Sequence, residues 1–456
     1  MKSDFLSHPA SFRDPDGRIL VEGQQIFREI RSSGIIGYNK LKKSGLYKAL
    51  TEKNMLIKHI EIESTSDRIL IQPDFLNHIS YPYEWSFSQL KDAALLTLDI
   101  QQEALNHGMS LKDASAYNIQ FINGSPVFID TSSFEVYVEG TPWVAYKQFC
   151  QHFLAPLALM AKSDLRLGLL LRNHIDGIPL DLAKKLLPFF TRFNFHLFLH
   201  IYLHSSLQGK YSASGVSQPK IRELTKTSLF GIIDSLKTCV RKLSLLRENT
   251  EWGDYYNNTN YEQTSFSAKV ALVQKMGMSV SPKCVWDLGA NKGVFSRVFS
   301  KMNVMTISWD IDPVAVEKNY LEVKKNKESF LYPQVLDLTN PSPSLGWDCK
   351  ERQGFFERSG SCDLVLALAL IHHLSISNNV PFTKVAEAFS RVGKFLLIEF
   401  VPKSDSQVEV LLSSRKDIFS EYDFENFEKS FSQYYDILEA SDVPGTKRKL
   451  YLMKKK

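Results

Sequence analysis

Aspartates and glycines recur between residues 284 and 340, and their types suit the binding of a polar organic ligand. Asp287 opens the segment Asp287-Leu288-Gly289-Ala290-Asn291-Lys292-Gly293, directly after an apolar run. Asp310 follows 23 positions later, and Asp337 comes next. Carboxylates accept hydrogen bonds from hydroxyl and ammonium groups, and glycine lets the backbone approach a ligand closely. We expect these residues to line one binding site.

Two adjacent histidines, His372 and His373, are the candidate general bases. They follow the apolar run at residues 364–368. Imidazole has a pKa suited to accepting a proton near neutral pH. Alternatively, one of them caps the next helix or packs in the wall of the site. Glu399, at the end of a later apolar run, is an alternative base or acceptor-binding group.

Strands that alternate with helices must position these side chains. The pattern predicts a helix at 265–278, a strand at 284–286, a helix at 294–301 and a strand at 304–309. Such alternation favours a parallel, doubly wound α/β sheet, whose strands end at the ligand site. Further strands are predicted at 334–336, 364–368 and 395–399, with a closing edge strand at 449–454.

The glycine turn does not carry the dinucleotide fingerprint. Gly-x-Gly-x-x-Gly requires glycine where this chain has Asn291 and Val294. A site for NAD is therefore disfavoured.

The segment from Asp287 to Gly293 resembles motif I of class I S-adenosylmethionine-dependent methyltransferases. The resemblance implies that Asp287 organises the loop and the ammonium end of the cofactor. It also implies that Gly289, Ala290, Asn291 and Gly293 pass close to S-adenosylmethionine. Asn291 replaces the commoner middle glycine, which is tolerable because asparagine adopts left-handed backbone angles more readily than most residues.

The two later acidic residues resemble further landmarks of the same family. Asp310 would bind the ribose hydroxyls and Ile311 would line the adenine. Asp312 competes for the ribose role, although the strand-end pattern favours Asp310. Asp337, followed by Leu338, would contact the adenine amino group.

The run from Cys362 to Leu374 resembles motif IV of methyltransferases that lack the Asn/Asp-Pro-Pro-aromatic signature. Ala367 and Leu368 would lie beside the methionine part of the cofactor. That signature holds planar amine acceptors, so its absence from the sequence favours methylation at oxygen or carbon.

Nearly the whole chain resembles a bacterial group of two-domain, nodulation-protein-like methyltransferases. Residues 79–94, 111–118 and 143–159 carry this resemblance. The nodulation label implies a link to signalling glycans or surface polysaccharides. We therefore expect a small-molecule or glycan acceptor.

The sequence divides into three parts. Residues 1–142 predict an α+β domain, residues 143–259 a helical connecting region, and residues 260–456 the methyltransferase domain. The predicted fold is thus a carboxy-terminal Rossmann-like sheet preceded by an α+β and helical half.

The amino-terminal part contains a loop that resembles the catalytic and metal-binding segments of kinase-like phosphotransferases. Asp113 would be the base, and Asn118 with Asp130 would hold magnesium. Leu111 stands where such enzymes have histidine, and no convincing glycine-rich loop precedes it. An inactive descendant or a structural loop is favoured. A kinase-like nucleotide-binding or phosphotransfer protein with a methyltransferase-like scaffold is one alternative function, and a nucleic-acid methyltransferase is another.

Residues 186–203 predict a buried amphipathic helix that also contains possible metal ligands. Arg192, His196, His200 and His204 recur every four residues and so share one helix face. Histidines at this spacing can bind zinc. A polar face on an apolar helix is the favoured interpretation, and we predict no metal.

Composition limits the remaining alternatives. The 456 residues are 44% hydrophobic, and 55 basic against 50 acidic residues give a net charge of +5. This balance makes nucleic acid an unlikely partner, and the basic residues at 447–449 and 454–456 are interpreted as a solvated strand and tail. Without an apolar leader or a pair of cysteines spaced CxxC, the chain is expected in the reducing cytoplasm and not in a membrane.

Overall fold

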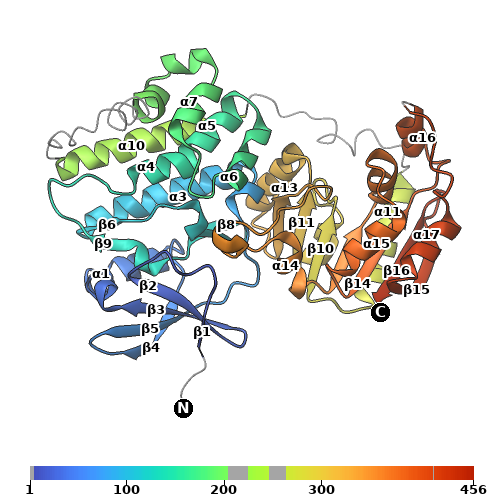
Figure 1. Ribbon diagram of the computed structural model, residues 1–456, viewed down its shortest axis with the longest axis horizontal. Coiled ribbons are helices and arrows are strands. Elements are labelled where there is room, and N and C mark those ends of the chain that lie inside the picture. Colours follow the sequence, from blue (N-terminus) through green and yellow to red (C-terminus); the bar gives the residue numbers. More distant parts are fainter. Residues whose placement is uncertain (1–4, 204–223, 246–262, 414) are drawn as a thin grey trace. The chain divides into compact units, whose positions relative to one another are not determined.

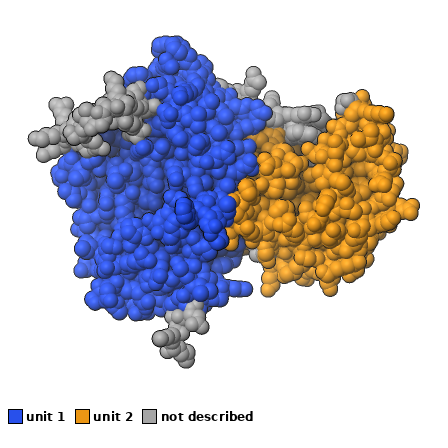
Figure 2. All heavy atoms as spheres, viewed as in Figure 1, with its two compact units in different colours: residues 1–247, 345–352 blue, residues 248–344, 353–456 orange. Residues whose placement is uncertain are grey.

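A computed structural model describes residues 5–203, 224–245, 263–413 and 415–456. The chain forms two compact units (Figure 2). Unit 1 comprises Met1–Arg247 and Leu345–Arg352, and unit 2 comprises Glu248–Ser344 and Gln353–Lys456. The predicted boundary at 259/260 lies outside the described residues, and the division of the first half at 142/143 stays a prediction.

Unit 1 begins with a five-stranded antiparallel sheet. Its spatial order is β1-β2-β3-β5-β4. Ile30, Ile69 and Ile71 point from the sheet onto Tyr38 of the following helix and form a small buried cluster. The bounds are β1 Leu6–Ser7, β2 Gly17–Glu22, β3 Gln25–Arg31, α1 Ser32–Lys43, α2 Leu46–Glu52, β4 His59–Ser64 and β5 Arg68–Pro73.

Helices form most of the rest of unit 1 (Figure 1). The long α3 (Phe87–Asn106) begins at Ser86, whose hydroxyl accepts a bond from the Gln89 N–H while the Gln89 side chain bonds back to Ser86. Two small antiparallel pairs follow, β6 (Met109–Leu111) with β9 (Phe134–Val136), and β7 (Ile119–Ile122) with β8 (Ser125–Phe128). The helices after them are α4 Tyr146–Phe149, α5 Ala155–Lys162, α6 Leu170–Asn173, α7 Leu180–Leu186, α8 Phe195–Leu197 and α10 Lys226–Lys242.

The predicted buried helix at 186–203 is wrong. Pro188 interrupts it, because proline lacks the N–H that a helix interior needs. The chain instead forms a 3-10 turn at Phe189–Phe193, the short α8, and a π-helical turn at Phe198–Leu203. Phe193 is 79% exposed, so much of the apolar character of this segment is not used in a core.

Unit 2 contains a seven-stranded sheet in the order β12-β11-β10-β13-β14-β16-β15. The five strands from β12 to β14 are parallel, and β16 is antiparallel to both of its neighbours. The bounds are β10 Cys284–Leu288, β11 Met305–Asp310, β12 Leu331–Val335, β13 Leu364–Ala367, β14 Phe395–Phe400, β15 Tyr435–Asp442 and β16 Lys449–Lys455. The last strand was predicted at the edge, and this is wrong, since β16 lies inside the sheet and β15 forms the edge.

Both faces of this sheet are covered by helices, as the doubly wound prediction requires. Alternate residues of β10 point to opposite faces, and Val285 and Trp286 belong to separate core clusters. One cluster includes residues of α11 (Gln263–Met278) and Phe299 of α12 (Ser296–Ser300). The other includes residues of α14 (Phe355–Arg358), α15 (Phe382–Ser390) and α17 (Phe424–Phe431). The predicted α/β class is confirmed for this unit, which also contains α13 (Pro313–Asn326) and α16 (Ser406–Ser413).

Among the described residues, no helix combines the length and apolar character needed to cross a bilayer.

Candidate functional site

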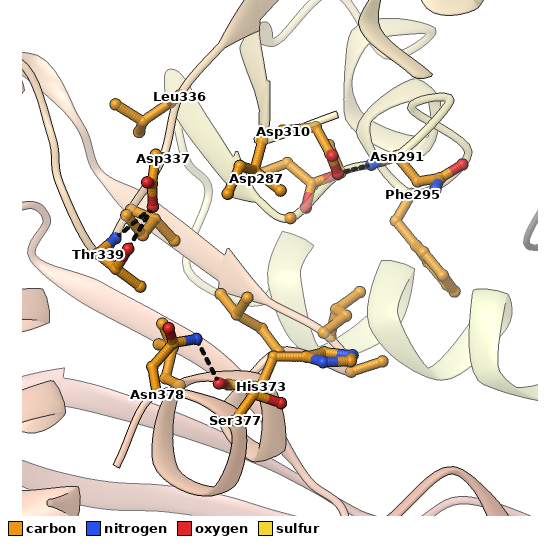
Figure 3. A pocket seen from close by; sticks show the side chains of 18 of the residues that line it. Asp287, Asn291, Phe295, Asp310, Leu336, Asp337, Thr339, His373, Ser377 and Asn378 are labelled. Carbon is orange, nitrogen blue, oxygen red and sulfur yellow. Dashed lines mark hydrogen bonds between the residues drawn. The ribbon is translucent and has the colours of Figure 1, made fainter. Parts of the chain in front are cut away.

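A cavity of about 340 Å³ opens in unit 2 where the parallel strands end. Figure 3 shows Asp287, Asp310 and Asp337 around it, with His373 below them in that view. Most of the predicted site residues line it, namely Asp287, Gly289, Ala290, Asn291, Asp310, Ile311, Asp337, Leu338, Leu368 and His373. Gly293, Ala367 and His372 are not among the lining residues.

The turn after β10 has the backbone that its sequence indicates. Gly289, Asn291 and Gly293 all have positive φ, at 77°, 51° and 75°. Asn291 therefore adopts the left-handed conformation for which it was singled out. At Gly293 an added Cβ would lie 2.6 Å from the Asn319 side-chain nitrogen, so this glycine is required by packing beneath the turn.

Asp287 is buried beside the turn, and its side chain is 2% exposed. Its Oδ2 accepts a hydrogen bond of 2.6 Å from the Ser296 hydroxyl. Burial raises the pKa of Asp287 to about 7, because a carboxylate loses hydration there. A cationic group bound in the cavity would favour the ionised form of Asp287 and lower its pKa.

Asp310 joins the end of β11 to the same turn. One carboxylate oxygen accepts the Asn291 N–H at 2.7 Å, and the other accepts the Asp312 N–H at 2.8 Å. Burial raises the pKa of Asp310 to about 6. Asp312 does not line the cavity, and its carboxylate caps α13 through the Val314 N–H at 2.9 Å. The geometry thus favours Asp310 over Asp312 as the ligand-binding residue of this pair.

Asp337 lies two residues beyond β12. Its Oδ1 accepts bonds from the backbone N–H and the hydroxyl of Thr339, at 2.8 and 2.6 Å. Leu338 lines the cavity beside it, and so does Ile311, which is 58% exposed. The bonds from Thr339 hold the carboxylate in a part of the chain where apolar side chains also line the cavity.

The two histidines have different surroundings. His373 lines the cavity, and burial together with the nearby Arg448 lowers its pKa to about 4. Its imidazole is therefore neutral at physiological pH, and the lowered pKa makes it a weaker base than an ordinary histidine. His372 is completely buried, and neither of its ring nitrogens has a hydrogen-bond partner among the described residues. The position of His372 fits packing in the wall, which was the alternative to a catalytic role.

The cavity is also lined by residues that the sequence analysis did not assign to it, among them Phe266, Lys269, Phe295 and Arg448. Lys269 and Arg448 are only 3% and 4% exposed. The basic run at 447–449 was interpreted as solvated, and this is wrong for Arg448, whose guanidinium binds Asp405 through two nitrogens at 2.7 and 3.0 Å. A lysine within the apolar repeat of the predicted helix at 265–278 was the available signal for Lys269.

The Glu399 side chain lies in the protein interior and does not line the cavity. It is fully buried, and its Oε2 lies 2.7 Å from the Lys269 ammonium nitrogen. Lys269 and Arg448 hold the pKa of Glu399 below its usual range against the opposing effect of burial. An ion-paired carboxylate of this kind is a poor proton acceptor.

The kinase-like residues of unit 1 form a closed polar cluster. Asp130 is ion-paired with Arg28 and accepts hydrogen bonds from the hydroxyls of Ser132 and Ser133. Asp113 accepts the Ser115 N–H at 2.9 Å, and burial raises its pKa. Within the described ranges, no group of three or more potential acidic, histidine or cysteine ligands could hold a metal ion.

The histidines considered for zinc bind a serine instead. His196 Nδ1 and His200 Nε2 lie 3.0 and 2.9 Å from the Ser235 hydroxyl on α10. The Tyr146 hydroxyl lies 2.7 Å from the other nitrogen of His200. Their shared helix spacing therefore serves a hydrogen-bond network, while His204 lies outside the described residues.

Comparisons with solved structures give weak overall likenesses. The bifunctional kinase-methyltransferase WbdD is 14% identical with a TM-score of 0.30, over 44% of this chain and 42% of WbdD. Magnesium protoporphyrin IX methyltransferase (ChlM) from Synechocystis PCC 6803, with bound SAH, is 14% identical with a TM-score of 0.30, over 45% of this chain and 93% of ChlM. The N-methyltransferase NodS from Bradyrhizobium japonicum WM9 is 8% identical with a TM-score of 0.29, over 42% of this chain and 98% of NodS.

Comparison with characterised sequences gives a full-length relative, although no protein-family profile matches the chain. Nodulation protein NoeA of Rhizobium meliloti (strain 1021) is 35% identical over 97% of this chain and 94% of its own length. The predicted membership of a nodulation-protein-like group is thereby confirmed. This chain belongs to the family of nodulation protein NoeA.

Proposed function

We propose that this protein is an S-adenosylmethionine-dependent methyltransferase. The observation that carries the proposal is the convergence of Asp287, Asp310 and Asp337 on one cavity, from the ends of three adjacent parallel strands. Ligands of open α/β sheets bind at this edge. Their order along the chain also matches the order of the class I methyltransferase motifs that their sequence resembles.

The lining residues fit the parts of this cofactor. Asp287 and Lys269 offer opposite charges side by side for the ammonium and carboxylate of an amino acid. Asp310 would accept hydrogen bonds from the ribose hydroxyls. Asp337 would bind the adenine amino group, and Leu338 and Ile311, which also line the cavity, would contact the adenine ring.

The bound cofactor would supply an electrophilic methyl group, and the chain's own residues would orient the acceptor and exclude water. Phe266, Phe295 and Leu411 provide apolar wall on the cavity. His373, neutral at physiological pH, would accept a hydrogen bond from an acceptor hydroxyl and orient it, and its lowered pKa of about 4 makes it a weak general base. His372 would act only by supporting His373, since their ring centroids are 4.1 Å apart.

We propose a small-molecule or glycan acceptor methylated at oxygen or carbon. After β13 the chain continues as Leu368-Ala369-Leu370, which lacks the polar side chain that would hold a planar amine. The nodulation label of the relative supports a signalling or surface glycan as the acceptor class.

Isothermal titration with S-adenosylmethionine and S-adenosylhomocysteine tests the proposed function. We expect both to bind with a stoichiometry of one. Absence of binding by either compound to folded protein would overturn the proposal.

The kinase-like alternative is not proposed. Arg28, Ser132 and Ser133 already occupy the carboxylate oxygens of Asp130, which would have to hold magnesium. Thermal shift with ATP and magnesium gives a direct check, and we expect no stabilisation.

A further inference from the structure

Glu399 binds two residues that line the cavity, although it does not line the cavity itself. It belongs to β14, and its side chain is fully buried. Its Oε2 accepts a 2.7 Å hydrogen bond from the Lys269 ammonium and another of 2.7 Å from the Ala369 backbone N–H. Lys269 comes from α11 and Ala369 from the turn after β13, so one oxygen fixes two elements that are distant in the sequence.

The turn at Ala369 needs such support. Ala369 has a φ of 49°, in the left-handed region that residues other than glycine rarely adopt. It lines the cavity together with Leu368 and Leu370. Since its N–H is bonded to Glu399, the direction of this peptide and of its neighbours is set by the buried carboxylate.

The Lys269 side chain is the second group that Glu399 fixes. Its ammonium lies 5.0 Å from the centre of the Phe295 ring and lines the same cavity as Asp287. A buried ammonium is costly unless it is paired. Glu399 supplies that pairing, and Lys269 is itself one of the residues that line the cavity.

We propose that Glu399 is a positioning residue that holds Lys269 and Ala369 so that the Lys269 ammonium binds the carboxylate at the amino-acid end of the cofactor. This inference rests on the proposed function. Asp287 takes the ammonium of the same amino-acid end, and Asp310 and Asp337 bind the nucleoside. Glu399 itself touches neither cofactor nor acceptor.

The test compares two ligands that differ only at the amino-acid end. S-adenosylhomocysteine has the amino acid, whereas 5′-methylthioadenosine keeps the adenosine and ends in a methyl group. In Lys269→Met and Glu399→Leu, we expect S-adenosylhomocysteine to bind roughly 10- to 100-fold more weakly, the range for losing a charge-assisted hydrogen bond. Affinity for 5′-methylthioadenosine should change less than about twofold, within ordinary context effects on a distant contact.

Further variants separate positioning from loss of structure. Lys269→Met leaves Glu399 with Arg448 at 3.8 Å, and Glu399→Leu removes an ion pair of the buried Lys269, so the double variant Lys269→Met/Glu399→Leu removes both members of the pair together. It should remain folded and still fail to discriminate between the two ligands. Lys394→Met breaks an exposed pair with Asp363 of the same 2.7 Å length and should change neither affinity.

A rescue experiment isolates the Ala369 contact. Glycine adopts positive φ without strain, so Ala369→Gly should restore part of the S-adenosylhomocysteine affinity lost in Glu399→Leu. It should restore none in Lys269→Met. Equal restoration in both backgrounds, or none in either, would overturn the role given to Ala369.

The outcomes distinguish this inference from the function on which it rests. If the wild type binds neither ligand, the proposed function fails. If the wild type binds both, and Lys269→Met weakens both equally or neither, the function stands and the positioning role of Glu399 is overturned.

Discussion

Asp310 and its near neighbour Asp312 have different expected roles, Asp310 in ligand binding and Asp312 in the stability of α13. We expect Asp310→Ala to weaken S-adenosylhomocysteine binding by roughly 10- to 100-fold, because it loses charge-assisted bonds to the ribose. The variant also releases the Asn291 N–H that Asp310 holds at 2.7 Å. Dissociation constants from titration calorimetry provide the measurement.

Asp312→Ala is the matched control for that change. Asp312 caps α13 and does not line the cavity, so its loss should cost about 1 kcal/mol of stability and leave affinity nearly unchanged. If Asp312→Ala proved the more damaging to binding, Asp310 would lose its assigned role.

Asp287 should make the stability of the free protein dependent on pH. Its pKa is raised to about 7 when folded, above the value of about 4 expected for an unfolded chain, so the folded state binds the proton more tightly. This contribution is fully present below pH 4 and is lost as pH rises towards 7. We expect Asp287→Asn to reduce the fall in unfolding free energy between pH 5 and 8 by more than about 1 kcal/mol, measured in urea.

The same carboxylate gives an opposite trend for the ligand. A cofactor ammonium favours ionised Asp287, so binding should tighten from pH 5.5 to 7.5 and release a proton. Titrations in buffers of different ionisation enthalpy would show that release. Identical pH profiles for the wild type and Asp287→Asn would contradict both expectations.

At the scale of elements, the turn between β10 and α12 depends on close backbone packing. Gly293→Ala would place a Cβ 2.6 Å from the Asn319 nitrogen at a positive φ of 75°. We expect a destabilisation of about 1–3 kcal/mol in urea unfolding. Gly231→Ala in α10 meets no atom within 4 Å and should instead stabilise by about 0.5–1 kcal/mol.

The elements that the sequence predicts well are those with uniform patterns. The strands at 284–288, 305–310 and 364–367 are buried on both faces, and their alternation with helices indicates a parallel sheet. The edge strand β15 alternates exposed with partly buried residues after Tyr435, which is a weaker signal, and it was not predicted. The helix predicted at 186–203 is not continuous, because Pro188 disfavours a helix there although the segment is rich in apolar residues.

The site residues also divide into those that the sequence predicts and those that it does not. Asp287, Asp310 and Asp337 follow recognisable strand ends, so their common position was predictable from order alone. Lys269 precedes the first strand, and Arg448 lies in a basic run that resembles a solvated surface. Their burial follows from tertiary packing around Glu399 and Asp405, which no local pattern reports.

At the scale of the whole molecule, a short segment from the second half of the sequence is part of unit 1. Glu351 is 4% exposed and binds Arg13 at 2.8 Å, and the Arg352 guanidinium lies 4.1 Å from the centre of the Tyr117 ring. Residues 345–352 therefore contribute to the packing of the amino-terminal unit.

This packing can be tested by hydrogen exchange. Glu351→Ala should speed amide exchange in peptides covering residues 8–19 and 111–118, because it removes the partner of Arg13 and loosens the Arg352 contact. Asp348→Ala, which removes an exposed acid of the same segment, should leave both peptides unchanged. Faster exchange confined to residues 345–352 would contradict the role given to Glu351.

The course of residues 345–352 also limits how segments of this gene can be exchanged by recombination. The chain leaves unit 2 after Ser344, contributes eight residues to unit 1 and returns at Gln353. No single break in the gene can therefore yield both units complete. A chimaera that takes unit 2 from a relative must keep residues 345–352 from the same parent as the rest of unit 1. This requires two further junctions, after Ser344 and after Arg352. We therefore expect the two units to evolve together.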